Sequence, residues 1–487
     1  MPSYQPVIGL EVHAELETRS KMFCRCAVVD STNAAPNSSV CEICCGLPGT
    51  LPVINRRAVE FALRVALALE CDIAQTSQFA RKNYFYPDLP KGFQISQYEM
   101  PLATGGSLQI ETEAGAKPIG VRRVHLEEDT GKLFHLTDHS LIDFNRAGVP
   151  LLEIVSQPDM YSVEEVHAYA TGLRDLLRYL EVNSGDMDKG VIRFEANVSL
   201  RPAGDEALGT RVEIKNLNSF RAMARALAYE IDRQTALLAS GEPVRLETLG
   251  WDEAAGATVS QRGKEEAEDY RYFPEPDLPP LVVPPDWTDQ IRAALPELPA
   301  AKRARFVDQY ALTPYTAGVL TADRETADYF EAAAAAAVSA APVKLANWLT
   351  GDLFALLNET GRRLPTTDFP PGHLAELVDL VEAGTINQTV AKEVLATSYQ
   401  TGRAPAQLVS KGGLEQQSDP EKLGRLIDQV LRQNPEQVAL YAQGKTTLSH
   451  WFFGQVMQAA QGKADPRVVR RLLDEALRAL PSDVNGA

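Results

Sequence analysis

Three segments in the first half of the chain alternate strictly between apolar and polar side chains. In each of them the even-numbered residues are apolar and the odd-numbered residues are polar. A period of two residues is typical of a β-strand with one buried and one accessible face, and antiparallel sheets commonly have this form. We therefore expect a mostly antiparallel sheet with one polar face, containing residues 10–16, 192–200 and 211–215.

Helices are expected between these strands, but without a regular alternation. Asn55, Ser162 and Ser219 are good N-cap residues that each precede a helical pattern, and Ser162 with Glu165 forms a capping box. Because strands and helices do not alternate regularly, the sequence favours an α+β fold over a doubly wound parallel sheet.

Proline and glycine clusters divide the chain. Residues 274–285 are rich in proline, which is excluded from helix interiors and central strands, and the chain beyond residue 290 reads as almost wholly helical. Ser410-Lys411-Gly412-Gly413 marks a second break. At roughly 150 residues per domain, a chain of 487 residues has about three domains. We expect a mixed domain at residues 1–292, an all-α domain at 293–408 and an all-α tail domain at 409–487.

Five of the six cysteines lie close together, between Cys24 and Cys45. Cys24-x-Cys26 and Cys41-x-x-Cys44 are two short thiol pairs, a spacing that predicts a closed, structural Zn²⁺ site. An iron–sulfur cluster, or four adjacent cysteines without a metal, are the alternatives. Cys45 is interpreted as a spare thiol and Cys71 as a small core residue.

The polar strand faces carry groups that bind divalent cations. Glu11, His13 and Glu15 share one face, Glu195 and Asn197 share another, and Glu213 and Lys215 a third, while His125-Leu126-Glu127-Glu128-Asp129 adds three acids and a histidine. If these strands are neighbours, carboxylates and an imidazole converge, which suits Mg²⁺ or Mn²⁺ and phosphoryl transfer. The alternative is a solvated sheet face. The chain contains no Gly-x-x-x-x-Gly-Lys-Ser/Thr loop and no Gly-x-Gly-x-x-Gly motif.

The charge balance limits the class of partner. A net charge of −17 argues against non-specific coating of nucleic acid, which needs surplus Lys and Arg. Residues 409–487 have a different charge balance, with ten Lys and Arg against nine Asp and Glu. A polyanionic partner would therefore bind more easily to this segment than to the acidic remainder of the chain. No transmembrane run or signal peptide is visible, and we expect a cytoplasmic protein with no membrane partner.

Five long motifs, in order along the chain, carry a resemblance to one family. Together they resemble the B-subunit family of the aspartyl/glutamyl-tRNA(Asn/Gln) amidotransferases over essentially the whole chain. The motifs are Ile8-Gly9-Leu10-Glu11-Val12-His13-Ala14-Glu15-Leu16, residues 81–97, residues 142–154, Glu213-Ile214-Lys215-Asn216-Leu217-Asn218-Ser219 and residues 269–278.

The resemblance implies a fold and a reaction. The fold is a cradle-shaped, mostly antiparallel catalytic domain with a zinc knuckle, followed by the helical and tail domains. The reaction is ATP-dependent phosphorylation of the side-chain carboxylate of Glu-tRNA(Gln) or Asp-tRNA(Asn), followed by displacement of the phosphate by ammonia. An amidase, the A-subunit of the enzyme, releases that ammonia from glutamine, and a small C-subunit clasps the two larger ones.

The resemblance also implies roles for single residues. The catalytic residues that the resemblance implies are Glu11, His13, Glu128, Glu213 and Lys215. The implied magnesium ligands are Glu11, His13, Glu127, Glu128 and Glu213. Strand periodicity cannot decide between Glu127 and Glu128, which face opposite ways in an ideal strand, and the family resemblance favours Glu128. The substrate or ammonia path is expected at Lys82, Tyr84, Lys91, Asn216 and Asn218, for which ordinary surface positions are the alternative.

The tail domain ends in an amphipathic pattern over residues 466–480. Arg467, Arg471 and Arg478 share one side of the predicted helix and are expected to contact the tRNA backbone, with a solvated helix face as the alternative. Two other functions remain open at this stage. A zinc-stabilised RNA-binding module without catalysis would explain the cysteines and the tail, and a stand-alone ligase that uses free ammonia would need a nucleotide loop that is not visible.

Overall fold

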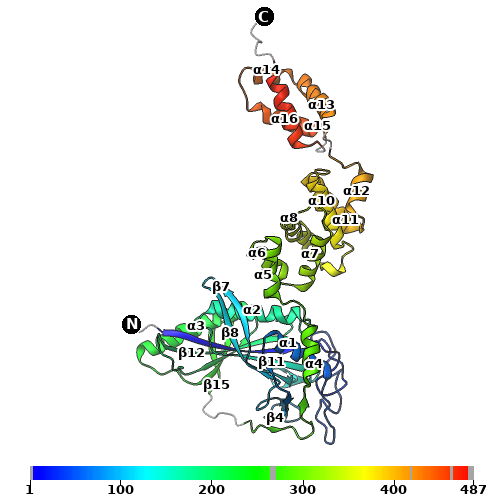
Figure 1. The fold of residues 1–487 in the computed structure, drawn as a ribbon. Coiled ribbons are helices and arrows are strands. Elements are labelled where there is room, and N and C mark those ends of the chain that lie inside the picture. Colours follow the sequence, from blue (N-terminus) through cyan, green and yellow to red (C-terminus); the bar gives the residue numbers. More distant parts are fainter. Residues whose placement is uncertain (1–3, 264–269, 417–418, 461–463, 481–487) are drawn as a thin grey trace. The chain divides into compact units, whose positions relative to one another are not determined.

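A computed structural model describes residues 4–263, 270–416, 419–460 and 464–480. The chain forms two compact units, residues 1–300 and residues 301–487. The first unit combines a large sheet with helices and the second is helical (Figure 1). The described residues form separate hydrophobic cores. The first unit has a main core and a small cluster of Val212, Val244 and Leu249, and the second unit has two cores that span Phe306–Val409 and Leu423–Leu477. The predicted boundaries at 292/293 and 408/409 stay predictions.

One ten-stranded sheet dominates the first unit. Its order is β15-β14-β13-β12-β1-β11-β8-β6-β2, with β7 paired to β8. The pairings are antiparallel except that of β13 with β14. The strands are β1 (Tyr4–Glu15), β2 (Asp72–Ile73), β6 (Ala103–Thr104), β7 (Ser107–Thr112), β8 (Gly115–Glu128), β11 (Pro150–Ser156), β12 (Ile192–Pro202), β13 (Val212–Leu217), β14 (Glu247–Asp252) and β15 (Ala257–Gly263).

Three smaller sheets accompany this one, the first with three strands and the others with two. They are β4 (Ala80–Asn83) with β5 (Phe93–Ser96) and β16 (Phe273–Pro274), β3 (Thr76–Ser77) with β17 (Leu281–Val282), and β9 (Lys132–His135) with β10 (Ser140–Asp143). The β16–β4 pairing places residues 270–274 beside β4, although the two segments are far apart in sequence.

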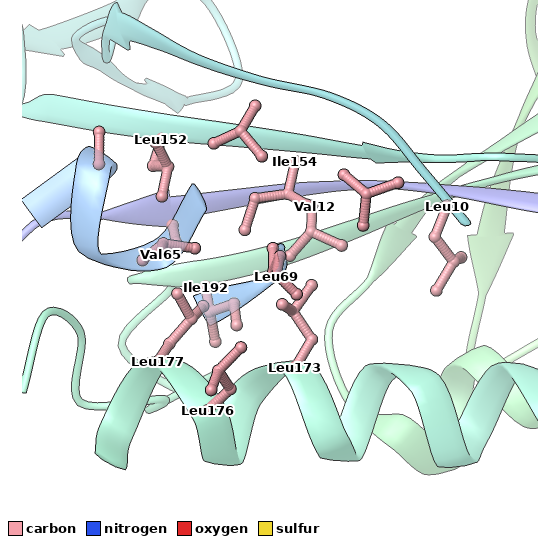
Figure 2. Packing of buried hydrophobic residues seen from close by; sticks show 14 of the residues in the cluster. Leu10, Val12, Val65, Leu69, Leu152, Ile154, Leu173, Leu176, Leu177 and Ile192 are labelled. Carbon is pink, nitrogen blue, oxygen red and sulfur yellow. The ribbon is translucent and has the colours of Figure 1, made fainter. Parts of the chain in front are cut away.

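The predicted alternation of β1 is confirmed. Leu10, Val12 and Ala14 are buried, whereas Glu11 and His13 on the opposite face are partly exposed. Helices cover the apolar face: α1 (Arg56–Ala68), α2 (Val163–Tyr179) and α3 (Phe220–Ser240). Figure 2 shows Val65 of α1 and Leu173, Leu176 and Leu177 of α2 packing toward the strands that carry Val12, Leu152, Ile154 and Ile192. The other face of the sheet is left for polar side chains.

The predicted helix starts are confirmed at three places. Asn55 accepts hydrogen bonds from the Arg57 and Ala58 amides, Ser162 from the Glu165 amide and Ser219 from the Ala222 amide. These caps satisfy backbone donors that have no partner within the helix. They fix where the helices that cover the sheet begin.

The second unit is helical, and most of its helices begin with proline, whose missing N–H costs nothing in the first turn. A helix of the first unit, α4 (Pro285–Ala293), precedes the second unit. The elements of the second unit are α5 (Pro299–Tyr310), α6 (Pro314–Thr321), α7 (Arg324–Ala336), α8 (Pro342–Trp348), a π-helical turn (Leu349–Leu353), α9 (Phe354–Thr360), a 3₁₀ turn (Leu364–Thr366), α10 (Pro371–Glu382), α11 (Gln388–Thr401), α12 (Pro405–Gly412), α13 (Pro420–Gln433), α14 (Pro435–Ala442), α15 (Leu448–Ala459) and α16 (Pro466–Arg478).

Candidate active site

A polar cavity of about 490 Å³ lies over the accessible face of the large sheet. The pairing register explains why its residues meet. His13 of β1 lies opposite Glu153 of β11, which in turn lies opposite His125 of β8, while Glu11 lies opposite Glu195 of β12. Directly opposed residues on one face of an antiparallel pair are about 5 Å apart, so polar positions on separate strands become one cluster.

A histidine and two glutamates stand at the centre of this cavity. The Nε2 atom of His13 is 3.4 Å from Oε2 of Glu153 and 3.7 Å from Oε1 of Glu127. One ligand atom from each of the three residues lies within 4.8 Å of the others, as metal binding requires. His125 Nε2 contacts the same Glu153 carboxylate at 3.2 Å. We call His13, Glu127 and Glu153 the acidic triad.

Burial and charge act together on the triad. Burial lowers the pKa of His13, but contact with the Glu153 carboxylate and the charges of Glu127 and Glu195 raise it to about 9. Burial opposes ionisation of Glu153, yet His125 and His13 hold the pKa of this carboxyl well below its usual range. Burial and the charge of Glu153 raise the pKa of Glu127. Two carboxylates and an imidazole thus lie within ligand distance of one another, a donor set that suits a divalent cation.

Glu128 lies outside the acidic triad. It accepts a hydrogen bond from the Ile95 amide at 2.9 Å and forms an ion pair with Lys91. Glu128 and Lys91 line a second cavity, of about 200 Å³, together with Cys24 and Cys44. The sequence prediction favoured Glu128 as a ligand beside His13, but the structure places Glu127 there. Glu127 is two residues from His125 and shares its strand face, whereas Glu128 faces the opposite way.

The other predicted site residues divide between the cavities and the surface. Glu11, Lys82, Tyr84, Glu213 and Lys215 line the large cavity. Lys215 lies between Glu195 at 3.0 Å and Glu213 at 3.4 Å, so its single positive charge offsets part of the charge of these two carboxylates. Asn216 and Asn218 are exposed, and they are not among the described residues that line either of these two cavities.

Lys82 joins the triad to an aromatic wall of the cavity. Its Nζ atom is 5.0 Å from the centre of the Tyr270 ring. Burial lowers the pKa of this lysine, but the nearby Glu127 carboxylate outweighs that effect and raises the pKa. Lys82 therefore stays a cation at neutral pH, beside the acidic triad.

The four predicted zinc ligands converge. One sulfur atom from each of Cys24, Cys26, Cys41 and Cys44 lies within 4.8 Å of the others. Lys21, which is fully buried, places its Nζ atom 3.7 Å from the Cys44 sulfur. Four thiols beside a buried cation fit a structural Zn²⁺ ion, whose four-thiolate complex is anionic. Cys71 is buried in the main core as expected.

Comparison with known proteins identifies the relatives of this chain. The family model described as the GatB/GatE catalytic domain matches residues 6–289, and the model described as the GatB domain matches residues 328–477. Proteins named as the B-subunit of aspartyl/glutamyl-tRNA(Asn/Gln) amidotransferase are similar to the chain almost end to end. That of Roseiflexus sp. (strain RS-1) is 51% identical over 97% of this chain and 98% of its own length. That of Moorella thermoacetica (strain ATCC 39073 / JCM 9320) is 49% identical over 97% of this chain and 100% of its own length.

The chain belongs to the amidotransferase B-subunit family. Members of this family are subunits of a tRNA-dependent amidotransferase, a glutamine-hydrolysing ligase. The resemblance inferred from the five motifs is therefore confirmed. Among the described residues, no helix is long and apolar enough to cross a membrane.

The predicted tRNA-binding arginines of this family member lie on α16. Arg467, Arg471 and Arg478 are exposed, and Arg471 forms an ion pair with Glu475 at 3.2 Å. The opposite side of the helix buries Val469, Leu473 and Leu477 in the third core. The arginines are thus available to a ligand.

Sequence reasoning missed Glu153, the residue that completes the triad of this amidotransferase chain. Glu153 lies in the run Pro150-Leu151-Leu152-Glu153-Ile154-Val155, which reads as a buried strand. Burying a carboxylate inside such a run costs free energy unless the carboxylate is paired, so its presence there was a signal that Glu153 has a buried partner. Arg193, which forms an ion pair with Asp129 at 2.8 Å and lines the same cavity, was also missed.

Proposed function

We propose that this chain phosphorylates the side-chain carboxylate of Glu-tRNA(Gln) or Asp-tRNA(Asn) with ATP and then amidates it with ammonia. The observation that carries the proposal is the cavity in which His13, Glu127 and Glu153 meet beside Lys82 and Lys215. The names of the relatives supply the aminoacyl-tRNA substrates. The acidic triad supplies the reason to expect phosphoryl transfer there.

The reaction needs an activated carboxylate. A carboxylate oxygen attacks the γ-phosphorus of ATP, the bond to the β-phosphate oxygen breaks, and ADP leaves. Ammonia then attacks the carbonyl carbon of the acyl phosphate, inorganic phosphate leaves with the bonding electrons, and the nitrogen loses a proton to give the amide. The first step replaces an oxide, which is a poor leaving group, with phosphate, which is a good one.

The acidic triad would hold the divalent cation of this reaction. His13, Glu127 and Glu153 offer one imidazole nitrogen and two carboxylate oxygens, a donor set suited to Mg²⁺ or Mn²⁺. A bound cation of this kind would neutralise phosphate oxygens and orient them for in-line attack. Glu11 and Glu213, in the same cavity, are proposed as further ligands or as partners of waters on the cation.

Two lysines of the cavity are proposed to neutralise the negative charge of the phosphate groups. Lys82 lies beside Tyr270, and Lys215 is held between Glu195 and Glu213. Because each lysine is partly buried, its attraction for a phosphate is screened less than it would be at the surface. We assign both to stabilising the transferred phosphoryl group.

The second cavity is proposed as the ammonia path. Its lining includes apolar side chains such as Phe93 and Ile95, and also the charged side chains of Arg81, Lys91, Glu128, Glu275 and Asp277. Uncharged ammonia passes apolar side chains readily, whereas an ammonium ion does not, so the apolar part of this lining favours passage of the deprotonated nucleophile. The acyl phosphate is then attacked by ammonia rather than by bulk water.

The proposal includes partners and cofactors. Ammonia would come from the amidase A-subunit, with a small C-subunit that binds both larger ones, and the assembly would work in the cytoplasm on tRNA. ATP is a substrate, Mg²⁺ or Mn²⁺ the catalytic cation, and Zn²⁺ a structural ion at the four cysteines.

The test is ATP cleavage by the chain assembled with its A and C partners, with and without Glu-tRNA(Gln) and Asp-tRNA(Asn). We expect cleavage that depends on a misacylated tRNA and is lost in Glu153→Gln. A matched Glu17→Gln variant, which changes a carboxylate outside the cavity, controls for general effects of the substitution. Cleavage that is absent, or indifferent to both tRNA and Glu153, would overturn the proposal in favour of an RNA-binding module without catalysis.

A further inference from the structure

We propose that Tyr98 and Tyr272 form a stacking platform for an adenine ring at the edge of the large cavity. This inference rests on the proposed function, in which both substrates, ATP and aminoacyl-tRNA, carry adenosine. It adds a binding site for the base, which the acidic triad and the lysines do not provide.

The two tyrosine rings are already stacked. Their centroids are 4.1 Å apart and their planes differ by 9°. Tyr98 follows β5 and Tyr272 precedes β16, and the Tyr98 side chain is 47% exposed. A parallel pair with an accessible outer face can be extended by a third flat ring, and bases stack on tyrosine in this way.

The platform lies between the large polar cavity and a smaller, less polar hollow. Tyr98 and Tyr272 line the large cavity and also a smaller hollow of about 100 Å³. Phe79, Met100 and Pro274 form apolar walls of this hollow, and Gln78 and Glu99 add an amide and a carboxylate. Adenine matches this combination, because it has apolar faces and an edge of hydrogen-bond donors and acceptors.

Arg123 connects the platform with the acidic triad. Its guanidinium carbon is 5.9 Å from the Tyr98 ring centre, and its Nη2 atom is 3.7 Å from Oε1 of Glu153. The Nε atom of Arg123 is buried and has no hydrogen-bond partner among the described residues. Phosphates that extend from a base on Tyr98 toward the triad would pass this guanidinium, which suits them in shape and charge.

The backbone holds the platform in place. The Asn83 amide donates to Tyr270 O at 2.9 Å, and Asn83 Nδ2 donates to Arg271 O at 2.8 Å. These bonds fix Arg271 in the left-handed region at φ 43°, which is strained for a residue with a side chain. On the other side, the side chain of Gln97, the residue before Tyr98, is held at both ends: its Oε1 accepts from the Leu126 amide at 3.0 Å and its Nε2 donates to the Ser77 hydroxyl at 2.7 Å. Both rings are therefore positioned before any ligand arrives.

The test uses the chain assembled with its A and C partners and measures KM for ATP and for the aminoacyl-tRNA separately. The variants are Tyr98→Ala, Tyr98→Phe, which keeps the ring, and Tyr315→Ala, which removes a tyrosine that is 82% exposed in the helical unit. Equilibrium dialysis of ATP with the full-length chain and Mg²⁺ gives a second readout, and melting curves check folding.

We expect Tyr98→Ala to raise the KM for ATP about tenfold with little change in kcat, while Tyr98→Phe and Tyr315→Ala stay within about twofold of the wild type. A rise confined to the KM for aminoacyl-tRNA would overturn the assignment to ATP and place the terminal adenosine of the tRNA on the platform instead. Unchanged KM values for both substrates overturn the inference. If the wild-type assembly fails to cleave ATP in a tRNA-dependent way, the proposed function fails, and ATP dialysis still tests the platform separately.

Discussion

Glu127 and Glu128 are adjacent in β8, yet their carboxylates line different cavities. Glu127 accepts a hydrogen bond from the Ser96 hydroxyl at 3.2 Å and faces His13, whereas Glu128 accepts from the Ile95 amide and pairs with Lys91. The strand period of two separates them, and the sheet gives each neighbour a different environment. We therefore expect the two residues to have separable functions.

The first prediction compares Glu127→Gln with Glu128→Gln. Glu127→Gln removes one proposed cation ligand and should raise the Mg²⁺ concentration for half-maximal ATP cleavage by about tenfold or more. Glu128→Gln should leave this Mg²⁺ dependence within about twofold and instead lower the amide formed per ATP cleaved. Magnesium titrations of the two variants provide the measurement. A larger Mg²⁺ effect in Glu128→Gln would contradict the assignment.

The second prediction concerns His13 and pH. Its pKa is raised from about 6.5 to about 9, so the charged histidine stabilises the fold fully below pH 6.5, and this contribution is lost as the pH rises through 9. Without added divalent cation, the stability advantage of the wild type over His13→Gln should fall by about 2–3 kcal/mol between about pH 6.5 and pH 9.5. Urea unfolding at both pH values measures it. A difference that stays constant or grows with pH would refute the assigned pKa shift.

The third prediction concerns Lys21 and zinc. Its ammonium group is fully buried beside Cys44 and would balance part of the charge of a four-thiolate zinc complex. Lys21→Met should weaken zinc binding about tenfold, as measured by competition with a chromogenic chelator. Lys189→Met is the matched control, since that lysine is exposed and contacts Asp30 near the same segment. Equal zinc affinities in the two variants would argue against the role of Lys21.

The fourth prediction concerns metal removal. A closed zinc site contributes directly to folding, and these four cysteines lie in a segment with little regular structure, between β1 and α1. Extraction of zinc should lower the melting temperature of the chain by several degrees, and re-addition of zinc should restore it. Metal analysis of the purified chain should return about one zinc per chain. An unchanged melting curve after verified zinc loss would show that the cysteines pack without needing the ion.

The fifth prediction concerns the tail helix. Reversing charge at Arg471 and Arg478 should weaken tRNA binding and flatten its dependence on salt, because each lost phosphate contact reduces the counterions released. Arg425→Glu combined with Arg432→Glu, at two exposed arginines on α13, controls for the change in net charge. Filter binding between about 50 and 200 mM salt measures both quantities. Affinity that is unchanged across this range would remove α16 from the tRNA interface.

Local patterns in the sequence predicted most of the fold. The alternation of residues 10–16 placed Leu10 and Val12 in the core, and N-caps such as Ser162 marked helix starts. Such features depend on neighbours within a few residues, so the sequence displays them directly. The cysteine spacing is local in the same sense, and the four thiols do converge.

The composition of the candidate site was only partly visible in the sequence. His13 and Glu127 were both named, but the choice between Glu127 and Glu128 could not be made from alternation alone. Glu153 was hidden within an apolar run. Tyr98 and Tyr272 carried no signal, because nothing in the sequence indicates that β16 pairs with β4 and brings the two rings together.

By itself, the sequence determined which segments are strands and helices, which strand face is polar, and the family to which the chain belongs. The tertiary structure alone decided which polar residues share a cavity. The physical reason is that strand order and register are set by packing of the whole apolar face against α1 and α2. That packing places Glu153 opposite His13 and leaves Glu128 with Lys91.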